Sequence, residues 1–272
     1  MLWIVGILIG LILGLTGAGG SVFAVPLLIW VIGLAPSQAM GVSLGVVAIA
    51  ALFGVIARLR SGEIQWLPAL VYATLGSAFT PAGQWLNQRI DEHWLMTGFG
   101  GLVLIIALRL WLQASRSPQE TKAVRASVSP GQDEGGAVCR MINDQPFRIG
   151  LPCAAGMSGG AILTGLLSGL FGVGGGFIIV PTLLFLTGIT IRQAVATSLV
   201  VISAVGISGF SSFLLRGGSP GSDILLQVGA GGIVGMTAGM LCSRFLSGPV
   251  LQKLFAVMML AIAAVTLYTQ YA

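Results

Sequence analysis

The chain has 272 residues, of which 56% are hydrophobic and only 8% are charged, and its mean hydropathy is +0.98. A soluble domain of this length needs far more polar surface, so the composition predicts an integral membrane protein. The apolar runs are long and continuous, which favours helices over a β-barrel. The formal charge of +5 does not indicate nucleic-acid binding, because nearly all basic residues lie in loops or at helix ends.

Apolar segments are predicted in two groups, which a polar stretch separates. The first group covers residues 2–15, 22–33, 39–57, 66–86 and 94–112, and the second covers residues 154–170, 177–188, 193–215, 224–246 and 250–269. The stretch between them is rich in charge, Ser, Pro and Gly, which is typical of an aqueous linker. The predicted organisation is a first transmembrane repeat at 1–112, a linker at 113–150 and a second transmembrane repeat at 151–272.

One glycine-rich pattern occurs in both groups. Gly10–Pro26 reads GLILGLTGAGGSVFAVP, and Gly165–Pro181 reads GLLSGLFGVGGGFIIVP. The same register continues through Gln-Ala at 38–39 and 193–194, and through Ser-Leu at 43–44 and 198–199. The sequence therefore predicts an internal duplication, and many secondary transporters consist of two such halves around a midplane site.

Each glycine pattern interrupts an apolar run, and a short helix is expected to restart directly after it. The roughly 12 residues that follow cover about 18 Å of a ~30 Å hydrocarbon core, so the two arms form either one interrupted span or a re-entrant hairpin. The re-entrant alternative leaves only Arg89 and Arg216 on one side of the membrane, whereas the spanning alternative divides the Lys and Arg residues more evenly.

The positive-inside rule favours the more uneven distribution. We therefore expect an all-α membrane protein with inverted halves, each holding a glycine-broken helix and about three spanning helices. The central loop is predicted to be cytoplasmic and the chain to lie in the inner membrane. An eight-span bundle with parallel halves is the alternative.

Helix N-termini at glycine breaks have free N–H groups and a partial positive charge, so they suit a small oxyanion. The predicted substrate-binding residues are the two breaks and one serine from the next segment of each half: Gly17, Gly19, Gly20, Ser21, Ser43, Gly172, Gly174, Gly175, Gly176 and Ser198. Weaker candidates for the pathway, or for a cytoplasmic mouth, are Gln38, Gln193, Arg58, Arg60 and Arg216. All of these also have a structural interpretation, because glycines allow close packing, hydroxyls bond to helix carbonyls and arginines snorkel.

No catalytic residue, metal site or cofactor is predicted. The three cysteines, Cys139, Cys153 and Cys242, have no C-x-x-C spacing and indicate neither a disulfide framework nor a zinc site. No Lys-Ser/Thr follows the glycines, so they do not form a P-loop. No Asp or Glu lies inside an apolar run, which leaves no obvious carboxylate relay for protons.

The duplicated G-x2-G-x-G-G-x4-V-P pattern at Gly14–Pro26 and Gly169–Pro181, with the Gln-Ala and Ser-Leu pairs and the polar central loop, resembles the sulfite exporter TauE/SafE family of bacterial membrane permeases. The resemblance implies a secondary transporter that exports small sulfur-containing anions, such as sulfite or organosulfonates, across the inner membrane. Ser21 departs from the glycine pattern and adds a hydroxyl donor.

Two other functions stay open at this point: a small-anion channel and a cysteine-dependent sulfur-relay membrane protein. The expected partners are the anion and membrane lipid, with no nucleic acid, and the oligomeric state is left open.

Overall fold

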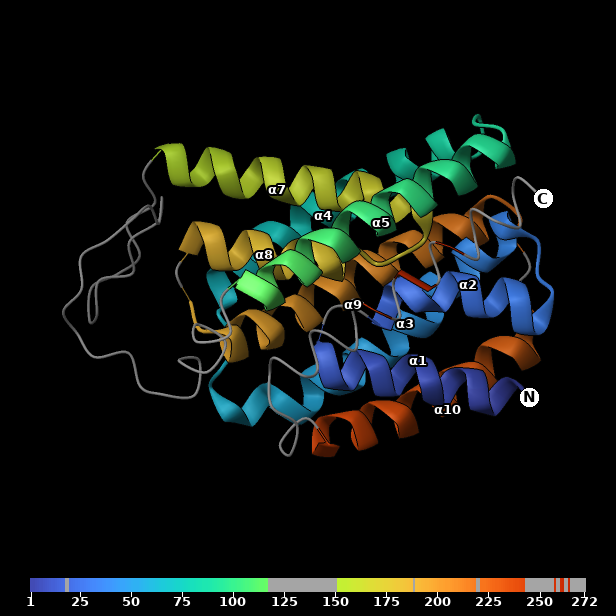
Figure 1. Cartoon of the computed structure of the whole chain (residues 1–272), viewed down its shortest axis with the longest axis horizontal. Helices are drawn as coiled ribbons and strands as arrows, with labels where there is room; N and C mark the ends of the chain where they lie inside the picture. The colour runs from blue at the N-terminus through green and yellow to red at the C-terminus, as the bar shows by residue number, and fades with distance from the viewer. Residues whose placement is uncertain are drawn as a thin grey trace.

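The computed structural model describes residues 1–17, 20–116, 151–187, 189–218 and 221–242, with single positions at 257, 260, 261 and 264. These residues form helices and no strand (Figure 1). The helices are α1 (Leu2–Thr16), α2 (Gly20–Ile32), α3 (Pro36–Arg58), α4 (Trp66–Asn87), α5 (Glu92–Arg116), α7 (Leu151–Phe171), α8 (Gly176–Thr187), α9 (Ile191–Leu215) and α10 (Ser222–Cys242). A short 3-10 helix, Leu59–Ser61, follows α3. The predicted apolar segments match these helices to within a few residues, and the predicted segment 250–269 lies outside the continuous described ranges.

Four of the described helical stretches are long and apolar enough to cross a membrane, judged by length and composition. They are Pro36–Ser61, Cys153–Phe171, Arg192–Leu215 and Asp223–Cys242. The chain is therefore an all-α integral membrane protein, as its composition predicts.

The chain reverses direction at a glycine after α1 and again after α7. Gly17 has φ +71° and ends α1 by donating its N–H to the Leu13 carbonyl at 2.7 Å. Gly172 has φ +70° and donates in the same way to the Ser168 carbonyl at 2.8 Å. Positive φ is accessible to glycine at little cost because it has no Cβ. From these breaks α2 runs back beside α1 and α8 runs back beside α7 (Figure 1), so each broken element is a helical hairpin.

The first helix of each half packs along a helix of the other half, α1 on α10 and α7 on α4. Small residues at these contacts let the backbones approach closely. A Cβ would collide with backbone atoms of the facing helix at Gly6, Gly10 and Gly14 of α1, at Gly231, Gly235 and Gly239 of α10, at Gly83 of α4, and at Gly165 and Gly169 of α7. Many of the chain's glycines are therefore explained by interfaces between the two halves.

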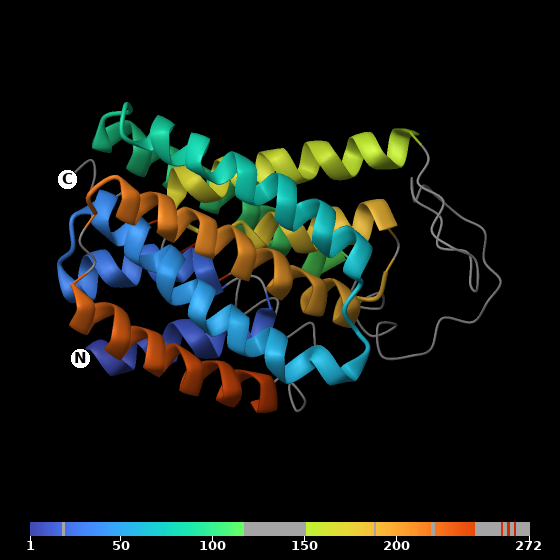
Figure 2. The same cartoon turned by 180° about the vertical axis from the view of Figure 1, so that it is seen from behind.

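Helices α3 and α9 occupy the same place in the two halves and run antiparallel. Gly41, near the start of α3, lies against Phe213, near the end of α9, whereas Gly54, near the end of α3, lies against Leu199. Seen from behind, α3 (blue) and α9 (orange) lie side by side in the middle of the bundle (Figure 2). Equivalent helices of the two halves thus point in opposite directions, which is the relation that inverted repeats require.

This antiparallel arrangement separates the arginines into two groups. Arg216 follows the end of α9 and lies where α3 begins, an end of the bundle that we call the Arg216 end. Arg58 and Arg60 lie at the opposite, Arg58 end, where Arg192 is in the first turn of α9. The three arginines predicted at a mouth therefore do not share one end.

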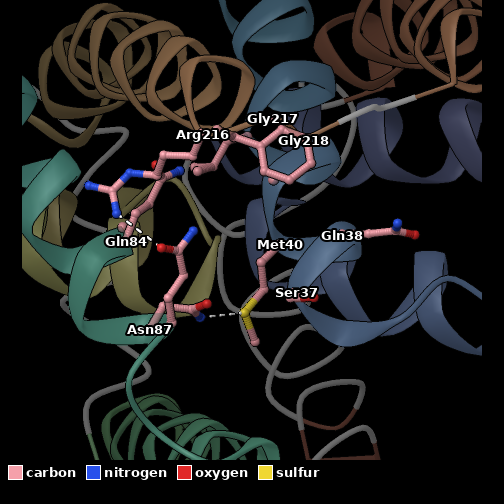
Figure 3. A pocket seen from close by; sticks show the side chains of 13 residues that line it. Ser37, Gln38, Met40, Gln84, Asn87, Arg216, Gly217 and Gly218 are labelled. Atoms are coloured by element: carbon pink, nitrogen blue, oxygen red, sulfur yellow. Dashed lines mark hydrogen bonds between the residues drawn. The ribbon is translucent and has the colours of Figure 1, made fainter.

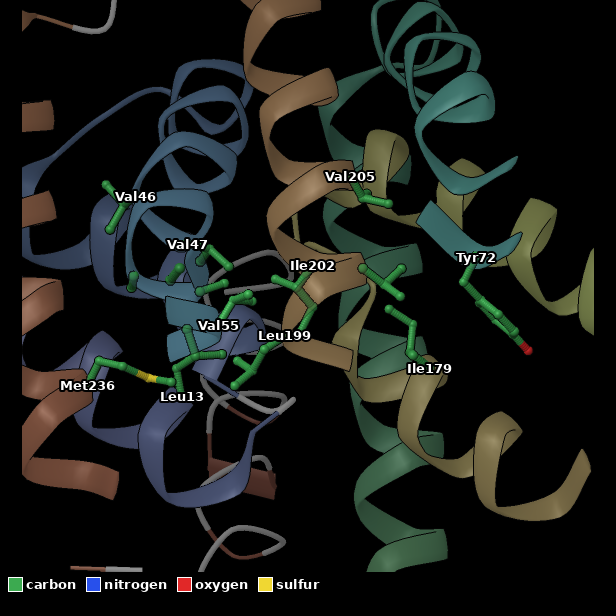
Figure 4. Close-up of a cluster of buried hydrophobic side chains, with 14 of the residues drawn as sticks. Leu13, Val46, Val47, Val55, Tyr72, Ile179, Leu199, Ile202, Val205 and Met236 are labelled. Carbon is green, nitrogen blue, oxygen red and sulfur yellow. The ribbon is translucent and has the colours of Figure 1, made fainter. Parts of the chain in front are cut away.

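The buried core is centred on the contact between α3 and α9. Val47 and Ile202 lie halfway along these two helices, and both are fully buried. Figure 4 shows them between the two helices, with Leu13 and Leu199 nearby. The two hairpins reach this level of the bundle from opposite ends.

Candidate functional site

The two glycine breaks meet at the centre of the bundle. A Cβ built on Gly174 would lie 3.5 Å from the Cβ of Ser21, 3.4 Å from Val47 Cγ1 and 3.6 Å from Ile202 Cγ2. Since Val47 and Ile202 lie halfway along α3 and α9, this meeting point is at mid-depth. The first turn of α2 and the start of α8 are thus brought together, as the duplicated pattern predicts.

The helix ends that meet here are both N-termini. Helix α2 begins at Gly20 and α8 at Gly176, and neither has an acidic residue in its first turn. From the centre they run to opposite ends of the bundle (Figure 1). Each N-terminus presents unpaired N–H groups and roughly half a positive charge, so together they favour an anion.

The glycines around this point have different roles in the packing. Gly174 and Gly175 both have positive φ, +69° and +66°, and so hold a backbone shape that other residues rarely adopt. A Cβ on Gly175 would collide with the Thr164 side chain, whereas one on Gly174 would find ordinary contacts. Gly20 lies against the backbone of Leu13. Gly19 lies outside the described residues.

A buried serine of α7 is a further candidate that the predicted set lacks. Ser168 is fully buried, and its hydroxyl oxygen has no hydrogen-bond partner among the described residues. Its Cβ lies 3.6 Å from the position of a Cβ on Gly175, beside the start of α8. Buried polar groups without a partner are rare in folded proteins, so this one calls for an explanation. The only signal in the sequence is a serine in an apolar run directly before a break.

Ser43 and Ser198 each connect one half to the glycine break of the other half. The Ser43 hydroxyl lies 2.5 Å from the Gly172 carbonyl, and the Ser198 hydroxyl lies 3.1 Å from the Gly17 carbonyl. Each hydroxyl also lies close to a carbonyl in its own helix, that of Met40 or Val195. Direct contact with a substrate stays a prediction for both serines, since each hydroxyl proton is already shared between carbonyls.

These contacts form two equivalent layers on opposite sides of the centre. The Met40 layer contains Met40, Ser43 and Gly172 and lies toward the Arg216 end. The Val195 layer contains Gly17, Val195 and Ser198 and lies toward the Arg58 end. Both are tightly packed, because a Cβ on Gly172 would lie 2.5 Å from Met40 Cα and one on Gly17 would collide with the Val195 side chain. Each layer separates the centre from one end of the bundle.

The weaker candidates lie away from the centre. Gln193 forms a capping box with Thr190 at the start of α9, and its backbone N–H donates to the Thr190 hydroxyl at 3.4 Å. Gln38 and Arg216 line a cavity at the Arg216 end. Arg58 and Arg60 end α3 and its 3-10 extension.

The cysteines are not gathered at this centre. Cys153 is disulfide-bonded, a pairing that the cysteine spacing does not indicate, and Cys242 is free and exposed. Cys139 lies outside the described residues. Across the described part of the chain, no group of three or more His, Cys, Asp or Glu could hold a metal ion.

A multi-pass helical bundle in which two halves run in opposite directions, and in which broken helices meet at mid-depth, has the architecture of a membrane transporter. The comparison with known families agrees. The Sulfite exporter TauE/SafE profile matches residues 2–266, and the chain belongs to this family.

Curated relatives carry the same general name. A "Probable membrane transporter protein" of Xylella fastidiosa is 30% identical over 270 residues, covering 98% of this chain and 94% of the relative. The "Probable membrane transporter protein YunE" of Bacillus subtilis is 25% identical and covers 80% of this chain and 78% of its own. A Haemophilus influenzae relative, also named a "Probable membrane transporter protein", is 29% identical over 80% of this chain and 74% of its own. No solved structure matches the chain.

Proposed function

We propose that the protein is a secondary transporter that exports small sulfur-containing anions, such as sulfite or organosulfonates, across the inner membrane. The anion binds between the starts of α2 and α8. The observation that carries the proposal is the approach of Gly174 to Ser21 at mid-depth, which brings two helix N-termini together. The choice of a sulfur-containing anion as the substrate is supported by membership of the TauE/SafE family.

The chemistry at the centre suits an oxyanion that must be released again. Backbone N–H groups of two helix starts supply donors without a full positive charge, and the Ser21 and Ser168 side chains lie beside them. A hydroxyl donates one hydrogen bond, so the unpartnered Ser168 hydroxyl is available to an oxyanion oxygen. Binding by dipoles and hydroxyls is weaker than binding by arginine, and release is correspondingly easier.

The orientation follows from the charges at the two ends. Arg89 and Arg216 lie at one end, and Arg58, Arg60 and Arg192 at the other. By the positive-inside rule, the Arg58 end and the linker at 113–150 lie in the cytoplasm. The antiparallel halves are then inverted repeats. An inside-negative potential then drives an anion outward with about 2.3 kcal/mol per charge per 100 mV.

The test compares two glycines that share one backbone conformation. Gly174 and Gly62 have φ +69° and +68°, so alanine at either position costs roughly 1–2 kcal/mol of backbone strain. A methyl at Gly174 would lie among Ser21, Val47 and Ile202, whereas a methyl at Gly62 would meet no atom of the described residues within 4 Å. We expect Gly174→Ala to weaken sulfite transport in proteoliposomes and Gly62→Ala to leave it unchanged.

Equal activity of the two variants would rule out the central site. The same vesicles separate a carrier from a channel, because a carrier shows saturable counterflow of labelled anion and a channel does not. The sulfur-relay alternative needs reactive thiols, so loss of transport after replacing Cys242 with Ser would favour it.

A further inference from the structure

A cavity of about 290 Å³, with several polar side chains in its wall, lies at the Arg216 end, where α3 begins and α4 and α9 end. Figure 3 shows Gln84 and Asn87 from α4, Met40, Ser37 and Gln38 from α3, and Arg216 after α9 around it. Carboxamides and a hydroxyl thus share its wall with one guanidinium. Its size suits a small ion or molecule rather than a lipid chain or a peptide.

Arg216 is the one charged side chain among the described residues that line this cavity. Its guanidinium donates to the Gln88 Oε1 atom at 3.2 Å and to the Pro81 carbonyl at 3.1 Å. Both acceptors are neutral, and the residues that line the cavity include no Asp or Glu. A guanidinium has five N–H donors, so donors are left for a bound anion, and no carboxylate in the wall cancels its charge.

The partial charges of the helix ends around the cavity do not cancel the positive charge of Arg216. The first turn of α3, with Ser37 and Gln38, contributes roughly half a positive charge, and the C-terminal ends of α4 and α9 contribute roughly half a negative charge each. With the full charge of Arg216, the cavity keeps a net positive potential. It therefore favours anions over cations and over neutral molecules.

The cavity leads toward the centre of the bundle. Met40 lines it and also belongs to the Met40 layer, and its sulfur lies 3.0 Å from the Asn87 amide nitrogen. The same amide nitrogen donates to the Leu170 carbonyl at 2.6 Å, next to the second hairpin turn. Beyond this layer lie Gly174 and Ser21. Only one packed layer thus separates the cavity from the meeting point of the two breaks.

We propose that this cavity is a second anion-binding site, a vestibule that holds a small oxyanion between the aqueous phase and the centre. Arg216 binds the anion, and the Asn87 and Met40 side chains close the inner wall. The place of the vestibule on a transport path rests on the proposed function, whereas the binding itself can be measured separately.

Binding is tested by titrating the purified full-length protein with ethanesulfonate, a stable small sulfonate. In the Gly174→Ala background, which weakens the central site, we expect the vestibule to be the tighter site, and R216Q should weaken it roughly 10- to 100-fold. R216K keeps the charge but loses the planar fork, so an intermediate affinity is expected. The control is R89Q, because Arg89 lies at the same end but stacks on Trp85 at 4.0 Å and is not in the cavity wall.

The two proposals fail in different ways. If R216Q leaves ethanesulfonate binding unchanged while Gly174→Ala weakens it, the vestibule is refuted and the central site stands. If Gly174→Ala changes nothing while R216Q abolishes all binding, the vestibule stands and the central site is refuted. Equal losses in R216Q and R89Q would show a nonspecific charge effect and would overturn the vestibule.

A labelling experiment gives a readout that does not depend on affinity fitting. Ser37 is exposed and lines the cavity, and Cys242, which is exposed, is first replaced with Ser. We expect S37C to react with a membrane-impermeant thiol reagent, and ethanesulfonate to slow this reaction in the protein with Arg216 but not in R216Q. Protection that is equal in both proteins would overturn the proposal.

Discussion

The hydroxyl of Ser43 lies 2.5 Å from the carbonyl of Gly172, so a helix of the first half is hydrogen-bonded to the hairpin turn of the second half. Ser198 and Gly17 form the equivalent bond on the other side of the centre. Each serine hydroxyl also has a carbonyl in its own helix within 2.9 Å. If the hairpin turn moves away, the serine hydroxyl therefore keeps a hydrogen bond within its own helix. This arrangement suits a contact that opens and closes.

The Ser43→Ala substitution should favour opening of the Met40 layer, which lies toward the Arg216 end. A buried hydrogen bond contributes about 1 kcal/mol, so its loss shifts the equilibrium roughly fivefold. The measurement is labelling of Val47→Cys by an impermeant thiol reagent in a Cys242→Ser protein, with Val47 retained as the background control. Ser43→Ala should raise labelling from the Arg216 side and Ser198→Ala from the Arg58 side. If both variants raise labelling from the same side, the two layers do not act as opposite barriers.

Ser168→Ala should weaken sulfite binding without lowering the stability of the free protein. The Ser168 hydroxyl is buried without a partner, so its removal relieves a desolvation cost and should leave the melting temperature of the free protein unchanged or raised. Affinity for sulfite should fall about fivefold or more, because a hydrogen bond to an anion is lost. Ser203→Ala is the control, since that hydroxyl already donates to the Val200 carbonyl at 2.8 Å. A lower melting temperature with unchanged affinity would assign Ser168 a structural role alone.

Valine substitutions at two glycines of α7 should have different effects on stability. A side chain at Gly165 would collide with the Gly76 backbone of α4, whereas a Cβ at Gly159 would meet no described residue within 4 Å. Gly165→Val should therefore cost about 2–3 kcal/mol or more of stability, and Gly159→Val should be close to neutral because valine is the better helix former. Thermal unfolding in detergent measures both. Similar melting temperatures would mean that α4 and α7 are not closely packed.

Flux should follow the membrane potential. No Asp or Glu lies inside an apolar run of the sequence, so export of a net anion is expected to be electrophoretic. In proteoliposomes a potassium diffusion potential that is negative on the cytoplasmic side should raise outward flux, with a driving force of about 2.3 kcal/mol per charge per 100 mV. Electrically silent flux that tracks only a pH gradient would contradict this mechanism.

Local patterns in the sequence were sufficient to predict the helices and the breaks. The apolar runs gave the segments, and the glycines before Ser21 and at Gly174 marked the restarts of α2 and α8. Arg216 and Arg58 lie at opposite ends of the bundle, which is the arrangement that the re-entrant alternative predicts. These features depend on composition and short spacings, which a single sequence displays directly.

Contacts between the halves could not be predicted in the same way. Glycines in a membrane helix indicate close packing, but nothing local shows that the helix facing Gly10 is α10. Ser43 was considered for its hydroxyl, and its partner Gly172 is far away in the chain. The cavity around Arg216 likewise combines the start of α3 with the ends of α4 and α9. Such partners are set by three-dimensional packing, which short spacings do not encode.

The packing of α1 on α10 and of α7 on α4 also limits how this fold can have arisen. Within the described part of the chain, the first helix of each half packs through closely spaced glycines along a helix of the other half. A protein with a single copy of the repeat would leave that face open in the membrane. We therefore expect a single-repeat protein of this kind to pair in the membrane with a second copy in the opposite orientation, which covers the same face.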